Sequence, residues 1–303
     1  MSLDFYTLDV FTEQRLAGNP LAVVLDADAL DVGRMQAIAR EFNLAETVFV
    51  MKPANPAHSA RVRIFTPARE LPFAGHPTVG TAVLLAELRT PGEIAERDAI
   101  IALEETVGLV RVGVRLRPGA APYAEFDAPR LPEDLGSPPP SERLAAALGL
   151  LPSEVGFANH RPTHYSAGVP FTFVPVASIE AIARAEPQPQ HWATAFGAVR
   201  AGLTYLYCGE TVHTTSSFHA RMFAPGAGIA EDPATGAAAV AFAGVLHRFD
   251  APPDGTHKRI IEQGYEMGRP SEMALSLEVQ GGKLITVRVG GSAVRVSEGR
   301  IAV

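Results

Sequence analysis

Two stretches of this sequence, residues 63–88 and 221–246, constrain the fold most because they repeat one order of features. Each begins with a strand-like run containing Arg-x-Phe-x-Pro, continues through a short loop, and ends in an almost wholly apolar run. The repeat has an offset of 158 residues, from Arg63 to Arg221. A helix that is apolar on every side has to be buried on every side. Strands are the abundant partners, so we expect two curved, mostly antiparallel sheets, each wrapped around one central helix.

A second pair of matching segments supports a duplicated chain. Gly18-Asn19-Pro20, followed by Leu-Ala-Val-Val, is echoed by Gly168-Val169-Pro170, followed by Phe-Thr-Phe-Val. In both halves this element comes before the Arg-x-Phe-x-Pro element. Two markers in the same order predict two similar halves.

Length and composition agree with two globular domains. The chain has 303 residues, of which 47% are hydrophobic and 19% are charged, so we expect it to fold throughout. The segment 118–122, Pro-Gly-Ala-Ala-Pro, is the best candidate for a linker. It predicts one domain at residues 1–118 and another at residues 123–292.

Composition also argues against several classes of protein. A net charge of −7 without a basic run argues against binding to nucleic acid. The longest uncharged apolar run, 236–246, is too short to span a bilayer, and the N-terminus lacks a basic signal region. We therefore expect a cytoplasmic protein without a membrane partner. Because Cys208 is the only cysteine, an intrachain disulfide and two-cysteine chemistry are excluded.

Both predicted central helices begin beside polar residues. Gly75-His76-Pro77 opens the first, and Asp232-Pro233 falls at the equivalent place when the offset of 158 is applied. Proline is tolerated in a first helical turn, and the polar residue before it can cap the helix. A helix N-terminus offers unpaired N–H groups and a positive dipole end, so it can bind a carboxylate or a developing negative charge. If the two halves face each other, both helix starts lie at one cleft.

Three titratable residues are candidates for chemistry. A helix capped by Asp31 and ending near Asn43 is predicted to precede Glu46, which then lies on a helix-to-strand connection. With His76 and Asp232, Glu46 forms a set suited to proton transfer without a cofactor. Each also has a structural explanation: Glu46 as a solvated carboxylate, His76 as a capping or packed imidazole, and Asp232 as an N-cap. No phosphate loop, dinucleotide loop, nucleophile elbow or metal-ligand spacing competes, so we expect neither metal nor cofactor.

At these residues the sequence resembles the phenazine biosynthesis PhzF-like family, whose fold is shared with diaminopimelate epimerase. The matching segments cover nearly the whole chain: DVFTEQRLAGNPLAVVLDA, NLAETVFV, RIFTPARELPFAGHPTVGTA, EDPATGAAA and EQGYEMGRPS. The resemblance implies an α+β fold of two pseudo-symmetric domains, each a mostly antiparallel β-barrel around a central apolar helix. It also implies an active site between the domains, a homodimer, and a last strand, about residues 293–303, that returns to the first domain.

The resemblance also assigns roles. The family's acting residues are the glutamate of N-x-x-E-T-x-F, the histidine of G-H-P and the aspartate of E-D-P-x-T-G, here Glu46, His76 and Asp232. The phenazine enzyme isomerises trans-2,3-dihydro-3-hydroxyanthranilate by moving a proton between ring carbons, and its glutamate carries that proton. Epimerase relatives instead use a cysteine at each helix start, and this chain has none there. Where phenazine enzymes tend to have serines, this chain has Ala45 and Ala237, so we expect a different pocket.

We therefore expect a cofactor-independent isomerase or epimerase that moves a carbon-bound proton on a small carboxylate substrate. Glu46 would be the shuttling acid/base, and His76 and Asp232 would orient the substrate or assist the transfer. N–H groups at Gly75 and Gly236 would hold the carboxylate or an enolate-like oxygen. The other residues expected to contact the substrate are Asn19, Ala45, Thr235 and Ala237. The alternative is a catalytically altered small-molecule binding or regulatory protein on the same fold.

Overall fold

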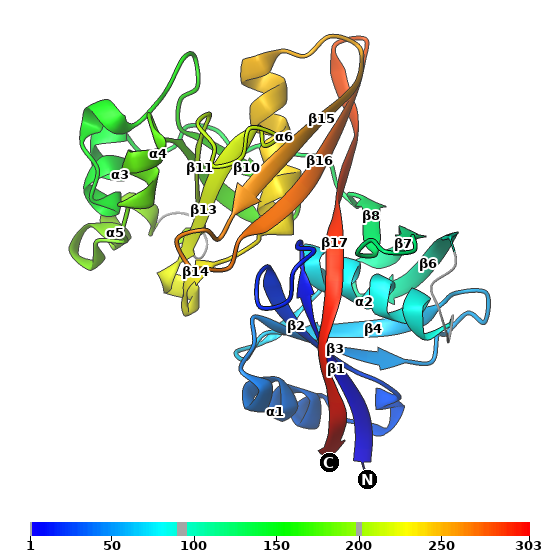
Figure 1. Ribbon diagram of the computed structural model, residues 1–303. Coiled ribbons are helices and arrows are strands. Elements are labelled where there is room, and N and C mark those ends of the chain that lie inside the picture. The colour runs from blue at the N-terminus through cyan, green and yellow to red at the C-terminus, as the bar shows by residue number, and fades with distance from the viewer. Residues whose placement is uncertain (1, 90–95, 198–201) are drawn as a thin grey trace. The chain divides into compact units, whose positions relative to one another are not determined.

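The structure, a computed structural model, describes residues 2–89, 96–197 and 202–303 of the chain. The chain divides into two compact units, each of which combines many strands with a few helices (Figure 1). Unit 1 contains Met1–Pro129 and Gly290–Val303, and unit 2 contains Arg130–Val289. Among the described residues, no helix is both long and apolar enough to cross a membrane. The predicted α+β class is confirmed.

Strand pairing sets the limits of the two units. The predicted linker, residues 118–122, lies inside unit 1, because the next strand, β8 (Tyr123–Asp127), still pairs with β7 (Gly108–Leu116). The C-terminal segment also belongs to unit 1, where the end of β17 (Lys283–Ala302) pairs antiparallel with β1 (Ser2–Val10). Proline and glycine content marked a turn within unit 1 and not the junction.

Unit 1 is a closed barrel of eight strands around helix α2 (Gly75–Leu88). Its remaining strands are β2 (Asn19–Val24), β3 (Glu46–Met51), β4 (Ala60–Phe65), β6 (Arg97–Glu105) and the short β5 (Glu70–Leu71), which pairs with β4. The order around the barrel is β1, β2, β3, β4, β6, β7, β8 and β17, and β17 pairs back with β1. The pairs β2–β3 and β4–β6 are parallel.

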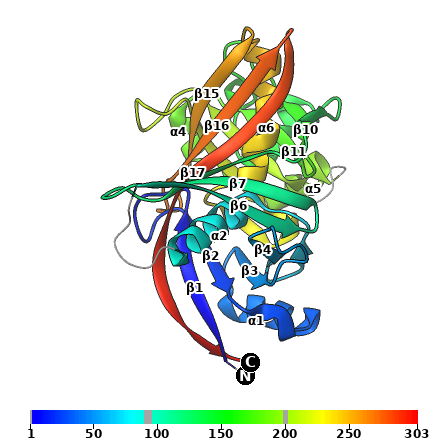
Figure 2. The ribbon, with the colours of Figure 1, turned by 90° about the vertical axis from the view of Figure 1, so that its right-hand side faces the viewer.

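Helix α2 fills this barrel (Figure 2). Every residue from Gly75 to Leu84 is buried, as a helix without a polar face requires. The helix approaches the wall so closely that a Cβ atom at Gly80 would lie 2.7 Å from the side chains of both Val10 and Leu21. The predicted arrangement of a buried helix inside a sheet is confirmed.

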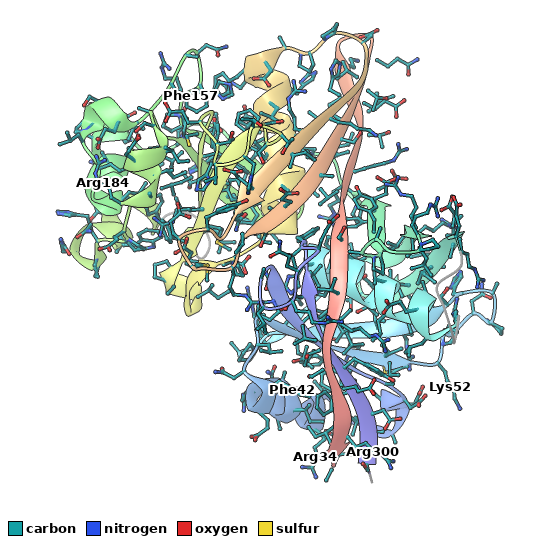
Figure 3. The ribbon with its side chains drawn as sticks, in the orientation of Figure 1. Arg34, Phe42, Lys52, Phe157, Arg184 and Arg300 are labelled. Carbon is teal, nitrogen blue, oxygen red and sulfur yellow. The ribbon has the colours of Figure 1, made fainter. Side chains whose placement is uncertain are left out.

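Helix α1 (Val32–Phe42) packs on the outside of the barrel beside the 3-10 turn η1 (Ala27–Ala29). Its predicted cap, Asp31, accepts a backbone N–H bond of 2.7 Å, and the helix ends at Asn43 in the left-handed conformation, with φ of 50°. Phe42, which is labelled in Figure 3, packs edge-on against Phe5 of β1, with 5.0 Å between the ring centroids.

Unit 2 repeats the strand order of unit 1 around helix α6 (Gly236–Asp250). Its strands are β9 (Glu133–Asp134), β10 (Thr163–Ser166), β11 (Pro170–Pro175), β12 (Thr204–Cys208), β13 (Phe218–Ala224), β14 (Ile229–Asp232), β15 (Gly255–Gln263), β16 (Ser271–Gln280) and the first part of β17. The pairs β11–β12 and β13–β15 are parallel, whereas β10–β11, β12–β13 and β15–β16 are antiparallel. In unit 1 the corresponding pairs have the same directions: β2–β3 and β4–β6 are parallel, and β1–β2, β3–β4 and β6–β7 are antiparallel.

Unit 2 differs in its additional helices, which form an apolar cluster with β12 and β13. They are α3 (Ser141–Leu148), α4 (Ile179–Ala183) and α5 (Pro189–Phe196), with the 3-10 turns η2 (Pro152–Glu154) and η4 (Pro225–Ala227) elsewhere in the unit. These elements enlarge the unit without changing the order of its strands.

The duplication extends to single hydrogen bonds at the predicted offset of 158. The Ser59 N–H donates to Ala102 O at 2.8 Å, and the Ser217 N–H donates to Ile260 O at 2.7 Å. The same two serines accept, through Oγ, the N–H groups of those partners at 3.1 Å and 3.2 Å. The two sequence markers therefore report a true structural repeat.

The arginines of the repeated Arg-x-Phe-x-Pro motif each hold a glutamate on the next short strand. Arg63 donates to both carboxylate oxygens of Glu70 at 2.7 Å and 2.5 Å, and Arg221 does so to Glu231 at 2.7 Å and 2.9 Å. The offset is 158 between the arginines but 161 between the glutamates. The second half therefore has three extra residues in the loop between the two strands.

This shift corrects the predicted start of the second helix. Both glutamates open a Glu-x-Pro-x-x-Gly segment, and both central helices begin at its glycine, Gly75 in unit 1 and Gly236 in unit 2. The uniform offset of 158 placed the second start at Pro233, which is three residues too early. Gly75 thus corresponds to Gly236, and His76 corresponds to Ala237.

The two arginines provide a matched pair for a stability test. Arg221 is 6% exposed, and it also donates to three backbone carbonyls of the segment 182–185, each at 2.9 Å. Arg63 and Glu70 have side chains about a quarter to a third exposed. Arg221→Met should cost about 3 kcal/mol of unfolding free energy, because it leaves Glu231, whose side chain is only 15% exposed, without its partner. Arg63→Met should cost about 1 kcal/mol or less. Urea unfolding of both variants measures the difference, and equal losses would contradict this assignment.

Candidate active site

Unit 1 brings two of the predicted residues into contact. Glu46 is the first residue of β3, and His76 is the second residue of α2. The Nε2 atom of His76 lies 3.2 Å from Oε2 of Glu46, and their side chains are only 5% and 13% exposed. The distance is that of an ion pair, although the two atoms are not aligned as a hydrogen bond. Two groups able to carry a proton therefore meet where little water reaches.

The sheet explains why Glu46 is at this place. β3 runs parallel to β2, and Glu46 stands opposite Leu21 in the register. The N-terminal ends of both strands therefore lie together, so the predicted contact residues Asn19 and Ala45 lie at the same end of the sheet as Glu46. Asn19 is fully buried, whereas Ala45 is half-buried. Both strands pack against α2.

The start of α2 determines the setting of His76. The residue before the helix, Ala74, is extended and provides no side-chain cap, and Gly75 is buried. His76 is therefore not a cap but a packed imidazole inside the first turn. Burial lowers the pKa of His76 from its ordinary 6.5 to about 3, so the ring is neutral at neutral pH. Glu46, if ionised, would favour the charged ring, but the cost of burying that charge is larger.

Unit 2 holds the remaining predicted residues. Asp232 ends β14, opposite Met222 of β13, and is partly exposed. The N-cap interpretation of Asp232 is wrong, because the cap position of α6 is Thr235. Proline disfavours a helical conformation in the residue before it, so Pro233 keeps Asp232 in the strand. The Thr235 hydroxyl instead donates to Oδ2 of Asp232 at 2.5 Å. Gly236 and the half-buried Ala237 follow as the first two helical residues.

Sequence reasoning missed the side chain that organises this turn. Gln263, the last residue of β15, is fully buried. Its Nε2 donates to the Asp232 carbonyl at 2.7 Å and to Thr235 Oγ1 at 3.0 Å, and its Oε1 accepts the Thr235 N–H at 3.3 Å. The next residue, Gly264, has a φ of 81°, and a Cβ atom there would overlap the carbonyl oxygens of Arg269 and Pro233. The Glu-Gln-Gly sequence was visible, but no sequence pattern showed which turn it contacts.

A buried histidine in the same region contrasts with His76. His219 has its Nδ1 at 2.8 Å from Glu262 and its Nε2 at 2.9 Å from Glu266. Burial opposes the charge of this ring, but the bonds and charges of the two carboxylates outweigh it and raise the pKa of His219 to about 9. His219 is therefore protonated at neutral pH, and it ties the loop after β15 to the sheet.

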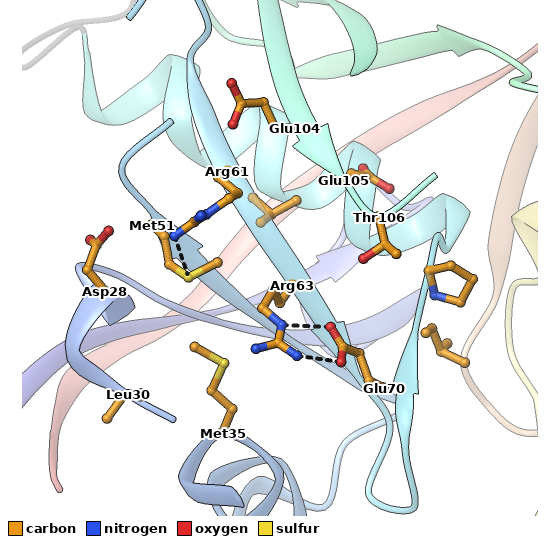
Figure 4. Close-up of a pocket in the computed structure, with 13 residues that line it drawn as sticks. Asp28, Leu30, Met35, Met51, Arg61, Arg63, Glu70, Glu104, Glu105 and Thr106 are labelled. Carbon is orange, nitrogen blue, oxygen red and sulfur yellow. Dashed lines mark hydrogen bonds and ion pairs between the residues drawn. The ribbon is translucent and has the colours of Figure 1, made fainter. Parts of the chain in front are cut away.

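A pocket of about 670 Å³ lies elsewhere in unit 1 (Figure 4). The Arg63–Glu70 pair lines it, and Arg61 donates to the sulfur of Met51, its neighbour on the adjacent strand, at 3.8 Å. Neither Glu46 nor His76 lines this pocket. Among the described residues, no group of three or more His, Cys, Asp or Glu side chains could hold a metal ion. The candidate for acid/base chemistry in unit 1 is therefore the contact between Glu46 and His76, and not this pocket.

Comparisons with known proteins agree over nearly the whole chain. The family profile described as phenazine biosynthesis-like protein matches residues 8–299. A protein of Mesorhizobium japonicum, described as an uncharacterized isomerase, is 53% identical over 306 residues, covering 98% of each chain. A trans-2,3-dihydro-3-hydroxyanthranilate isomerase of Pseudomonas aeruginosa is 36% identical over 300 residues, again covering 98% of each chain. The structure of a PhzF-family phenazine biosynthesis protein of Bacillus anthracis matches with a TM-score of 0.87 at 26% identity, covering 100% of both chains. The expected fold is confirmed.

The two buried histidines should differ in ionisation. Because the pKa of His76 is about 3, its ring should stay neutral between about pH 5 and pH 8, whereas His219, with a pKa of about 9, should stay charged. Two-dimensional ¹H–¹⁵N spectra of the imidazole groups measure this directly, with His76→Gln and His219→Gln assigning the signals. A His76 ring that titrates with a midpoint near 6.5 would contradict the burial argument.

Proposed function

Because the chain belongs to the phenazine biosynthesis-like family, we propose that it is an isomerase that moves a carbon-bound proton on a small carboxylate substrate without metal or cofactor. The observation that carries this proposal is the buried contact of 3.2 Å between Glu46 and His76. Removing a proton from carbon requires a positioned base, and returning it to another carbon requires a positioned acid. One carboxyl group can serve as both in succession.

In the proposed reaction Glu46 is the proton carrier. Its carboxylate takes the proton from the first carbon of the substrate, and the resulting carboxylic acid delivers it to the second carbon. Nε2 of the neutral His76 ring lies 3.2 Å from Glu46 and can donate or accept one hydrogen bond when the two groups align. His76 is therefore proposed to orient Glu46 in either protonation state. Asp232 is proposed to assist on the same substrate through its partly exposed carboxylate.

Negative charge develops on the substrate while its proton is on Glu46. The first turns of α2 and α6 begin at Gly75 and Gly236, and neither has a side-chain cap bond. The N–H groups of such helix starts and the positive end of the helix dipole stabilise a carboxylate or an enolate-like oxygen. We propose this role for Gly75 and Gly236.

The relatives support the substrate class but not one compound. The substrate named for the Pseudomonas aeruginosa relative is itself a carboxylate. Here, however, Ala45 precedes Glu46 and Ala237 follows Gly236, so neither place offers a hydroxyl to a polar substrate. We therefore propose a substrate that is less polar near these two positions.

The proposal predicts that the protein exchanges substrate hydrogen with solvent. Wild-type protein is incubated with a bacterial small-molecule extract in D₂O, and mass spectrometry identifies carboxylates that gain carbon-bound deuterium. Glu46→Gln keeps the size of the side chain and removes its acid/base function, so exchange should fall by about 10²-fold or more. Asp31→Asn, an equally conservative change outside the site, should leave exchange unaltered. Undiminished exchange in Glu46→Gln would exclude its proposed role, and tight binding without any exchange would favour the alternative of a binding protein.

A further inference from the structure

Glu105 is a buried carboxyl group outside the proposed reaction. It is the last residue of β6 and is only 8% exposed. Its Oε1 atom lies 2.7 Å from the hydroxyl of Thr78 in the first turn of α2. Its other oxygen, Oε2, is buried and has no hydrogen-bond partner among the described residues. An ionised carboxylate in such a place would be costly, because nothing compensates one of its two oxygens.

The hydrogen bonds of the Thr78 hydroxyl indicate whether Glu105 carries a proton. The Thr78 hydroxyl lies 2.8 Å from the carbonyl oxygen of Ala74 and 2.7 Å from Glu105 Oε1. A hydroxyl has one proton to donate, and a backbone carbonyl can only accept. If Thr78 donates to Ala74, the short contact with Glu105 requires a proton on Glu105. A protonated carboxyl satisfies both contacts at once, whereas a carboxylate satisfies only one.

Unit 2 has a similar contact, built with a neutral side chain and with a threonine that lies four residues earlier relative to the start of the helix. The pairing of Ala60 with Leu103 in unit 1 corresponds to the pairing of Phe218 with Ile261 in unit 2. This register makes Gln263, two residues after Ile261, the counterpart of Glu105. Gln263 donates to the hydroxyl of Thr235, and Thr235 donates to Asp232. In both units the last residue of a strand, Glu105 of β6 or Gln263 of β15, thus contacts a threonine hydroxyl. That hydroxyl also lies within hydrogen-bond distance of a second oxygen, the Ala74 carbonyl in unit 1 and the Asp232 carboxylate in unit 2.

We propose that Glu105 is held as a neutral carboxylic acid that donates to Thr78 and so positions the first turn of α2, as Gln263 positions the turn before α6. Because that turn carries His76, the consequence for catalysis rests on the proposed function. The protonation state does not rest on it. Glu105 is thereby a positioning residue and not a catalytic one.

Among the described residues, the charges near Glu105 do not include a cation that pairs with it. The charged groups lining the pocket beside it are Arg63, Glu70, Asp28, Arg61 and Glu104 (Figure 4). On its paired strand β7, Arg111 and Arg115 are exposed, and on α2 the titratable side chains are His76 and Glu87, of which Glu87 pairs with Arg295. Arg63 is engaged by Glu70, Glu104 is held by His58 at 2.7 Å, and His76 is neutral. Burial raises the pKa of Glu105 from its ordinary 4.5 to about 8. A bond donated by Thr78 to the ionised carboxylate would favour the charged form, but its effect is smaller than that of burial.

The test compares the stability of wild-type protein and Glu105→Gln as a function of pH. A carboxyl whose pKa is higher in the folded state stabilises the fold below its unfolded pKa, and this contribution is lost as the pH rises. Relative to Glu105→Gln, the urea midpoint of the wild type should therefore fall between about pH 5 and pH 8, and then level off. The amide provides the same donor at every pH. Gln263→Glu should introduce a similar fall, and Glu272→Gln, an exposed change on β16, should show none.

Infrared spectroscopy provides a direct readout of the proton. The carbonyl band of a protonated carboxyl should be present in wild-type protein at pH 6 and absent in Glu105→Gln, while Glu272→Gln retains it. Parallel pH curves, or no loss of the band in Glu105→Gln, would overturn the proposal. At pH 6, Glu105→Gln should lose less stability than Glu105→Ala, because the amide can donate the same hydrogen bond to Thr78 as the neutral acid. An equal loss in the two variants would also overturn the proposal. None of these measurements needs a substrate, so their failure is distinguishable from failure of the proposed isomerase activity.

Discussion

The burial of two helices that have no polar face is the constraint on which the rest of the structure depends. Helix α2 is buried from Gly75 to Leu84, and α6 is buried over most of its length. Such helices can exist only inside a shell that covers them completely. Each unit supplies that shell with the same sequence of parallel and antiparallel strand pairs. The shell also determines where each helix can begin, and the proposed chemistry takes place at those starts.

The framework is symmetric, but its titratable groups are not. Thr47 pairs with Phe65 in unit 1, and Thr204 pairs with Phe223 in unit 2, so Thr47 and Thr204 are equivalent. The position equivalent to Glu46 is therefore Leu203, directly before β12. The position equivalent to His76 is Ala237, and the one equivalent to Asp232 is Leu71. One unit therefore contains the buried contact between Glu46 and His76, and the other contains a single carboxylate, Asp232, at a different place in its turn. Because the two units do not have equivalent acid/base residues, the structure fits transfer of a proton by one carrier better than a mechanism with one equivalent base in each unit.

Much of this could be predicted from sequence, and the limits have physical causes. The apolar helices, the repeat and the candidates Glu46 and His76 were accessible, because apolar periodicity and short motifs are local properties. The start of α6 was misplaced because an insertion of three residues between Arg221 and Glu231 is invisible to a constant offset, although the shared Glu-x-Pro-x-x-Gly segment could have revealed it. Glu105 and Gln263 were missed because their role depends on contacts across strands, which no local pattern encodes.

We propose that one shielded carboxyl, Glu46, both removes and returns the hydrogen. The most direct test is the fate of deuterium placed at the migrating position of the substrate. In a single turnover in ordinary water, we expect part of the product to keep the deuterium on its new carbon, because the side chains of Glu46 and His76 are only 13% and 5% exposed where they meet. Product that contains no deuterium from the first turnover onward would contradict transfer by a single shielded carrier.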